Sequence, residues 1–68
     1  MDPRIDELRS LLREDPGSRR FFQLGEILRK ENDLTGASEV LQQGLQHHPR
    51  YVAAWVSLGR VNLAAARI

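Results

Sequence analysis

The chain has 68 residues, enough for one small domain, and 41% of them are hydrophobic, too many for a typical disordered segment. It contains no cysteine, which excludes disulfides, cysteine nucleophiles and thiolate metal sites. With 10 lysine and arginine residues against 9 acidic ones, the net charge is +1, which argues against general electrostatic affinity for nucleic acid or an anionic membrane.

Three turn signals divide the chain into four segments of helical character. They are Asp15-Pro16-Gly17-Ser18, Asn32-Asp33 and His48-Pro49-Arg50. Their spacing of roughly 14 to 17 residues suits helices joined by short turns. No segment alternates apolar and polar residues over a sustained stretch, so the pattern does not favour strands. We therefore predict an all-α fold of about four antiparallel helices.

The first two helices are predicted over residues 3–14 and 19–31. Asp2 is the expected N-cap of the first, because its carboxylate can accept from the unpaired N–H groups of the first turn. Ser18 is the expected N-cap of the second. Asn32 is the best candidate for a left-handed residue that ends the second helix, since Asn tolerates that conformation better than most residues.

The last two helices are predicted over residues 35–47 and from Tyr51 or Val52 onward. Asp33 or Thr35 is expected to cap the third helix. Both helices carry apolar or small residues at helical spacing. These are Ala37, Val40, Leu41, Gly44 and Leu45 in the third and Trp55, Leu58, Gly59, Val61 and Leu63 in the fourth.

A short motif occurs twice along the chain. When the sequence is shifted against itself by 34 residues, three pairs align: Phe21 with Trp55, Leu24 with Leu58, and Gly25 with Gly59. An aromatic residue, two intervening residues and then Leu-Gly therefore recur at this period. The motif and its period resemble those of the tetratricopeptide repeat, whose helix–turn–helix unit begins in this way.

Further residues extend the resemblance to nearly the whole chain. Ala37 stands where the family places a small residue that lets its two helices approach, and Pro49 ends the unit. The family commonly has Tyr, an aromatic residue and Ala at the positions of Leu28, Leu41 and Gly44. The resemblance implies one complete repeat over residues 18–51. Residues 3–14 would be a helix of a preceding half-repeat, and residues 52–68 the first helix of a following repeat. Gly25 and Ala37 are expected to meet where the two helices of the complete repeat approach closely.

The resemblance also implies a function. Such repeats form a right-handed superhelical stack that serves as a protein–protein interaction scaffold or adaptor, and the first helix of each unit lines a concave face that binds an extended or helical peptide. No cofactor is implied. Carried onto this chain, the ligand face comprises Arg19, Phe22, Glu26, Arg29, Lys30, Ala53, Val56, Arg60 and Leu63.

Other function classes have less support. No serine lies in a Gly-x-Ser-x-Gly elbow and no phosphate-binding loop occurs, so we expect neither an enzyme nor a metal site. No run resembles a signal core or a membrane span, so the cytoplasm is the expected location and no membrane partner is expected.

The alternative function is a helix-turn-helix-like nucleic-acid-binding domain. Its reading helix would be residues 35–47, which contain no Lys or Arg to anchor phosphates, so a nucleic-acid partner is not expected.

Several polar and aromatic residues allow two interpretations. His47 and His48 either complement the negative end of a helix or bind a metal, although adjacent helical residues point about 100° apart. Arg19 and Arg20 begin a helix, where the dipole disfavours cations. They are either surface charges with an acidic neighbour or part of a ligand-facing basic patch. Phe22 lies beside the core and is either packed or exposed to a partner.

The last helix has no second helix of its own unit. In the repeat frame Trp55 is a core residue between helices, with a binding hot spot as the alternative. Without a partner helix, an edge comprising Trp55, Leu58, Gly59, Val61 and Ile68 is uncovered, and such an edge is an association surface. We expect either that the chain belongs to a longer repeat array or that two chains bury this edge against each other, by exchanging helices in a symmetric dimer.

Overall fold

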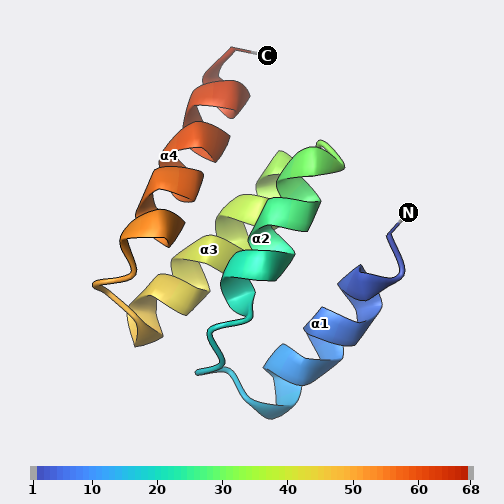
Figure 1. Cartoon of the computed structure of the whole chain (residues 1–68). Coiled ribbons are helices and arrows are strands. Elements are labelled where there is room, and N and C mark those ends of the chain that lie inside the picture. Colours follow the sequence, from blue (N-terminus) through green and yellow to red (C-terminus); the bar gives the residue numbers. More distant parts are fainter. Residues whose placement is uncertain (1, 68) are drawn as a thin grey trace.

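The computed structural model describes residues 2–67, and every regular element in that range is a helix. The helices are α1 (Arg4–Glu14), α2 (Phe21–Lys30), α3 (Leu34–His47) and α4 (Val52–Ala66), as Figure 1 shows. The four predicted helices are therefore confirmed, with ends that differ from the expected ones by at most a few residues. The all-α class is confirmed with them.

Three polar side chains accept hydrogen bonds from backbone N–H groups near the starts of helices, and one of them is an N-cap. Asp2 Oδ1 accepts from the backbone N–H of Arg4 at 2.9 Å, and Asp33 Oδ1 accepts from that of Gly36 at 3.0 Å. Ser18 Oγ accepts from the N–H of residue 20 at 3.2 Å, one turn before α2. Of the two candidates for α3 the cap is Asp33, so the prediction for that helix is confirmed. The N-cap residues of α1 and α2 are Pro3 and Arg20, without a side-chain cap hydrogen bond, so the predictions that Asp2 and Ser18 are the N-caps are wrong in position.

A left-handed residue ends α2. Asn32 has φ 64°, and among the described residues no other non-glycine residue has a positive φ. This turn lets the backbone N–H of Asp33 donate to the carbonyl oxygen of Leu28 at 2.9 Å, which satisfies an acceptor that the helix itself leaves unpaired. The prediction for Asn32 is confirmed, and the chain reverses here from α2 into α3.

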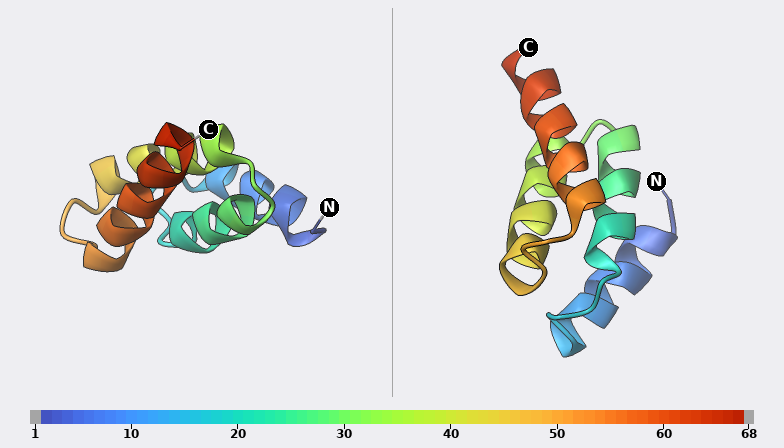
Figure 2. Two further views of the ribbon diagram at one scale, coloured as in Figure 1. Left: turned by 90° about the horizontal axis from the view of Figure 1, so that it is seen from above. Right: turned by 60° about the vertical axis from the view of Figure 1, so that its left-hand side comes forward.

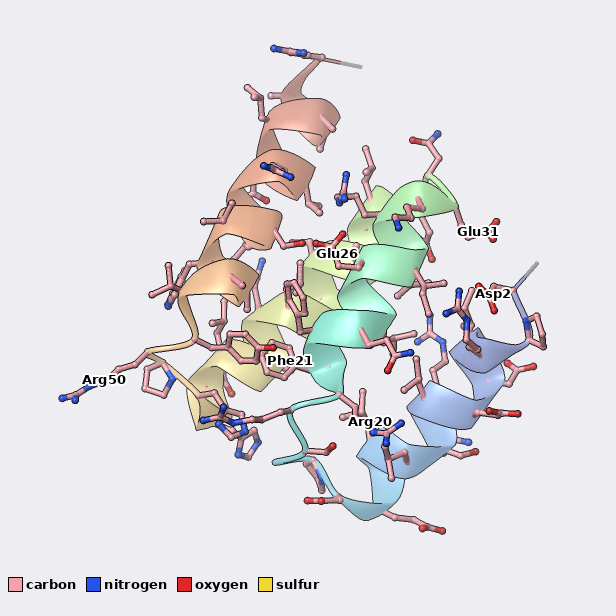
Figure 3. The ribbon with its side chains drawn as sticks, in the orientation of Figure 1. Asp2, Arg20, Phe21, Glu26, Glu31 and Arg50 are labelled. Atoms are coloured by element: carbon pink, nitrogen blue, oxygen red, sulfur yellow. The ribbon has the colours of Figure 1, made fainter. Side chains whose placement is uncertain are left out.

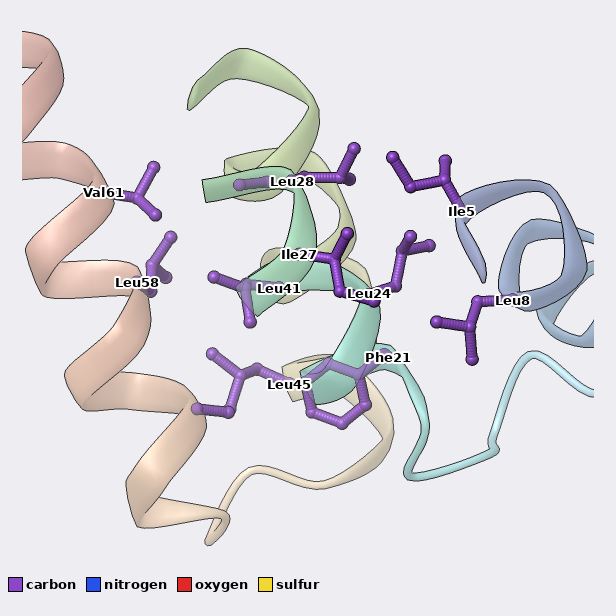
Figure 4. Close-up of a cluster of buried hydrophobic side chains, with 12 residues drawn as sticks. Ile5, Leu8, Phe21, Leu24, Ile27, Leu28, Leu41, Leu45, Leu58 and Val61 are labelled. Atoms are coloured by element: carbon purple, nitrogen blue, oxygen red, sulfur yellow. The ribbon is translucent and has the colours of Figure 1, made fainter. Parts of the chain in front are cut away.

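The helices pack in chain order into a flat body of 34 × 30 × 14 Å. Each helix contacts the next one, and α2 also contacts α4, so α2 and α4 lie side by side along α3 (Figures 1 and 2). In this arrangement α1 touches only α2. The core runs through all four helices, as the close-up in Figure 4 shows. Its buried side chains are Ile5, Leu8, Phe21, Leu24, Ile27, Leu28, Ala37, Leu41, Leu45, Ala54, Leu58 and Val61.

Two glycines let α2 and α3 approach closely. A Cβ placed on Gly25 would lie 2.7 Å from Leu41 Cδ2, and a Cβ placed on Gly44 would overlap the ring of Phe21. Each helix thus packs one bulky side chain against a glycine of the other helix: Phe21 of α2 on Gly44, and Leu41 of α3 on Gly25. The three atoms nearest to the Cβ placed on Gly25 all belong to Leu41, and the predicted contact of Gly25 with Ala37 stays a prediction. Ala37 is fully buried elsewhere along the same helix.

The orientation of α4 differs from the expected one. Leu58 and Val61 are buried, only 8% and 1% exposed, because they lie on the side of α4 that packs on α2 and α3 (Figure 4). Trp55 is 49% exposed and donates its Nε1–H to the carbonyl oxygen of Pro49 at 2.7 Å. The predictions that Trp55 is core and that Leu58 and Val61 are uncovered are therefore wrong. The exposed predicted edge reduces to Trp55 and Gly59, and Ile68 lies outside the described residues.

Candidate protein-interaction face

Tyr51 joins the start of α2 to the start of α4. Its ring lies 5.4 Å from that of Phe22 in a tilted arrangement, and the Arg19 guanidinium carbon lies 5.7 Å from the Tyr51 ring centroid. Tyr51 also meets the buried ring of Phe21 edge-on at 5.6 Å. Phe22 is consequently half-buried, while Arg19 is exposed. The structure thus brings two of the predicted ligand-face residues together through a third that the sequence did not single out.

Glu26 lies in the middle of α2, on the side facing α4 (Figure 3), and forms an ion pair with Arg29. Arg29 donates two hydrogen bonds to Glu26 Oε2, at 3.1 Å from Nε and 2.6 Å from Nη2. Burial alone would raise the pKa of Glu26, but the hydrogen bonds and charge of Arg29 outweigh it, so the pKa of Glu26 lies below its ordinary value. Glu26 is therefore ionised at neutral pH, and its charge is compensated by Arg29.

Ser57 of α4 faces this ion pair. Its hydroxyl is buried and makes no hydrogen bond that meets the usual geometric limits among the described residues, although its proximity also favours the ionised form of Glu26. A buried hydroxyl without a partner is unfavourable, so a small rotation that lets Ser57 donate to Glu26 would be favourable. Ser57 of α4 and Glu26 of α2 thus lie close together as polar groups between these two helices.

The exposed side of α4 is unusually apolar. Within residues 2–67 all the exposed large hydrophobic side chains belong to this one helix. Among them are Val56 and Leu63, two predicted ligand-face residues, and Arg60 is exposed between them. Arg60 forms no ion pair with any described residue. The four exposed side chains, between 49% and 71% exposed, are Val52, Trp55, Val56 and Leu63.

Lys30 lines a hollow of about 330 Å³ between the start of α1 and the end of α2. Glu26, one turn earlier on α2, lines the same hollow. Asp2 and Arg4 form an ion pair at 2.6 Å on the opposite side of that hollow, and the hydrogen bonds from Arg4 lower the pKa of Asp2 to about 2. Lys30 therefore lies on the α1 side of α2, whereas Glu26 borders this hollow and also lies near Ser57 of α4.

A second hollow, of about 430 Å³, separates α1 from α3. Its floor comes from Phe21 and Leu24 of α2, and basic side chains at its edge include Arg9, Arg13 and His47. No sequence signal indicated it, because its residues come from three helices whose relative positions only the packing defines.

The two adjacent histidines have different surroundings. His47 lines the hollow between α1 and α3, whereas His48 stacks on the Phe21 ring at 6.0 Å. The His48 Nε2 atom also lies 2.6 Å from the carbonyl oxygen of Gly17, a hydrogen bond that connects the end of α3 to the turn before α2. Across the described part of the chain, no three His, Asp or Glu side chains gather where they could hold a metal ion.

Comparison with known proteins finds no matching family model, no similar curated protein and no similar solved structure. From Asp2 to Arg67, no helix is both long and apolar enough to span a membrane.

Proposed function

We propose that this chain is a protein-interaction module that binds a peptide or helix across α2 and α4. The observation that carries the proposal is the concentration of every exposed large hydrophobic side chain of the described residues on α4. Soluble domains rarely expose contiguous apolar surface without a binding role. This surface adjoins Phe22 and Arg19, which Tyr51 links to the start of α4.

The proposal includes a tetratricopeptide-like architecture. Three features support it: the motif repeated at 34 residues, the tight α2–α3 hairpin, and the contact of α2 with α4, which carry the two copies of the motif. In that architecture α2 and α4 are equivalent first helices and share one ligand face. The exposed residues Val56, Arg60 and Leu63 extend it along α4.

The chemistry of this face favours a ligand with both apolar and acidic groups. Val56 and Leu63 offer apolar area, while Arg60 and Arg19 offer guanidinium groups that can bind carboxylates in bidentate geometry. The single acid of the face, Glu26, is already neutralised by Arg29. A peptide with acidic and aliphatic side chains therefore fits better than a basic one.

Selection from a displayed library of random peptides tests the proposal. We expect enrichment of acidic, aliphatic sequences, and at least about tenfold weaker binding of the selected peptides to Arg60→Ala and Leu63→Ser variants. Arg9→Ala on α1 is the matched control and should bind as the parent chain does. Equal binding by all variants would refute the proposed face. Salt-sensitive binding of random duplex DNA would instead favour a nucleic-acid-binding domain.

A further inference from the structure

The aromatic residue and the glycine of the repeated motif pack against another helix in α2 but not in α4. In α2, the Phe21 ring fills the space beside Gly44 of α3, and Gly25 receives the side chain of Leu41. In α4, 34 residues later, Trp55 is half-exposed and a Cβ on Gly59 would meet no atom within 4 Å. Helix α4 therefore carries a half-exposed bulky side chain and, beside its glycine, a gap that no other group in residues 2–67 fills.

Trp55 and Gly59 complement each other between two copies of α4. Residues four apart lie on the same side of a helix, one turn from each other. When two α4 helices pair antiparallel about a twofold axis that passes midway between Trp55 and Gly59 on the exposed side of α4, Trp55 of each copy lies opposite Gly59 of the other. We propose that two copies of this chain associate in this way, with each indole packed over the glycine of the partner.

The α2–α3 pair of this chain provides a template for that contact. There, too, antiparallel helices exchange a bulky side chain for a glycine in both directions: Phe21 lies against Gly44, and Leu41 against Gly25. The α4 pair would repeat the arrangement with identical helices. Both bulky groups come from Trp55 and both gaps from Gly59, so a single surface is sufficient.

The residues around Trp55 and Gly59 suit a helix-pair seam. Spacings that alternate between three and four residues are typical of such seams, and residues 52, 55, 59, 62 and 66 follow them. Within α4 the only charged residue is Arg60, which lies about 100° round the helix from Gly59. Two copies can therefore approach along this seam without burying a charge.

The Trp55 side chain is already held in place. Its hydrogen bond to the Pro49 carbonyl fixes the indole against the turn before α4. A side chain that is ordered before binding loses less conformational entropy in the complex. Trp55 contributes to the exposed apolar surface of α4 that supports the proposed peptide binding, but Gly59 does not, so Gly59→Leu tests the association separately from peptide binding.

Sedimentation equilibrium of the whole chain at micromolar concentrations tests the association. We expect a reversible dimer, and because Trp55 is the only tryptophan, its fluorescence should shift to the red on dilution. Gly59→Leu fills the gap and should weaken the dimer at least about tenfold while preserving helicity, since nothing lies near that position within a monomer. Ala53→Leu, on another exposed side of α4, is the matched control and should leave the dimer unchanged.

Cross-linking tests the register. The chain has no cysteine, so single cysteines introduced by Val52→Cys and Asn62→Cys report one contact each. These positions lie opposite each other in the proposed pair, and a mixture of the two variants should form the mixed disulfide. A mixture of Val52→Cys and Ala66→Cys, which reports a register shifted by four residues or about one turn, should not. A chain that stays monomeric, a Gly59→Leu variant that dimerises normally, or a preference for the 52–66 disulfide would each overturn the proposal.

Discussion

Helices α2 and α4 carry one motif in two different environments. In α2 the aromatic residue and the glycine are both buried in a complete interface with α3, whereas in α4 the equivalent Trp55 and Gly59 face away from the core. The Leu between them is buried in both, as Leu24 and Leu58. The motif therefore defines two surfaces of its helix. The leucine side is buried in both copies, whereas the aromatic–glycine side packs on α3 in α2 and is uncovered in α4.

The largest expected difference comes from truncating the aromatic residue. Phe21→Ala should destabilise the chain by about 3–5 kcal/mol, because it empties the centre of the core. Trp55→Ala should cost about 1 kcal/mol or less in dilute monomer, since the indole is half-exposed and makes one surface hydrogen bond. Urea unfolding followed by circular dichroism measures both. Equal losses would mean that Trp55 is a core residue after all.

Adding a methyl group to the glycines of the α2–α3 interface should come next. Gly44→Ala should cost about 1–3 kcal/mol, because the new Cβ overlaps the Phe21 ring. Gly25→Ala should cost less, since the flexible end of Leu41 can move aside. Thermal unfolding ranks the two variants. A harmless Gly44→Ala substitution would show that the helices lie farther apart than the structure has them.

A glycine-to-alanine substitution in α4 should raise the free energy of unfolding instead of lowering it. Gly59→Ala should stabilise the monomer by about 0.5–1 kcal/mol, because alanine favours helix over glycine and no atom lies within 4 Å of the new Cβ. Chemical unfolding at concentrations too low for association isolates this effect. If Gly59→Ala destabilised the monomer, the result would indicate that another group packs against Gly59.

The smallest effect concerns the ion pair that α2 has and α4 lacks. Glu26→Gln should cost about 0.3–0.5 kcal/mol at neutral pH, the size typical of a helical ion pair. The pKa of Glu26 is lowered in the folded state, so the pair's contribution is complete above the ordinary value of 4.5 and is lost as the pH falls through the lowered pKa. Unfolding of parent and variant across this acid range measures it. A difference independent of pH would show that the charge of Glu26 is not involved.

The sequence predicted which residues of the candidate site lie on α2 and α4, but not which of their side chains contact one another. The 34-residue repeat placed Phe22, Arg29, Val56 and Arg60 on α2 and α4, which the structure brings into contact. It did not indicate that Tyr51 packs on Phe22, because Tyr51 precedes α4 and takes no part in helical periodicity. It also did not separate Lys30 from Arg29, although adjacent helical residues face different neighbours.

The sequence alone determined the four helices and located their ends to within a few residues. Asp33 caps α3 and Asn32 ends α2 through hydrogen bonds and dihedral angles of a few adjacent residues, and such local preferences can be inferred from a short stretch of chain. Only the tertiary structure decided that Gly25 receives Leu41 and that α4 buries Val61 while exposing Trp55. A helix's rotation about its own axis is set by the sum of its contacts with all neighbouring helices, and an apolar stripe as broad as that of α4 is compatible with several rotations.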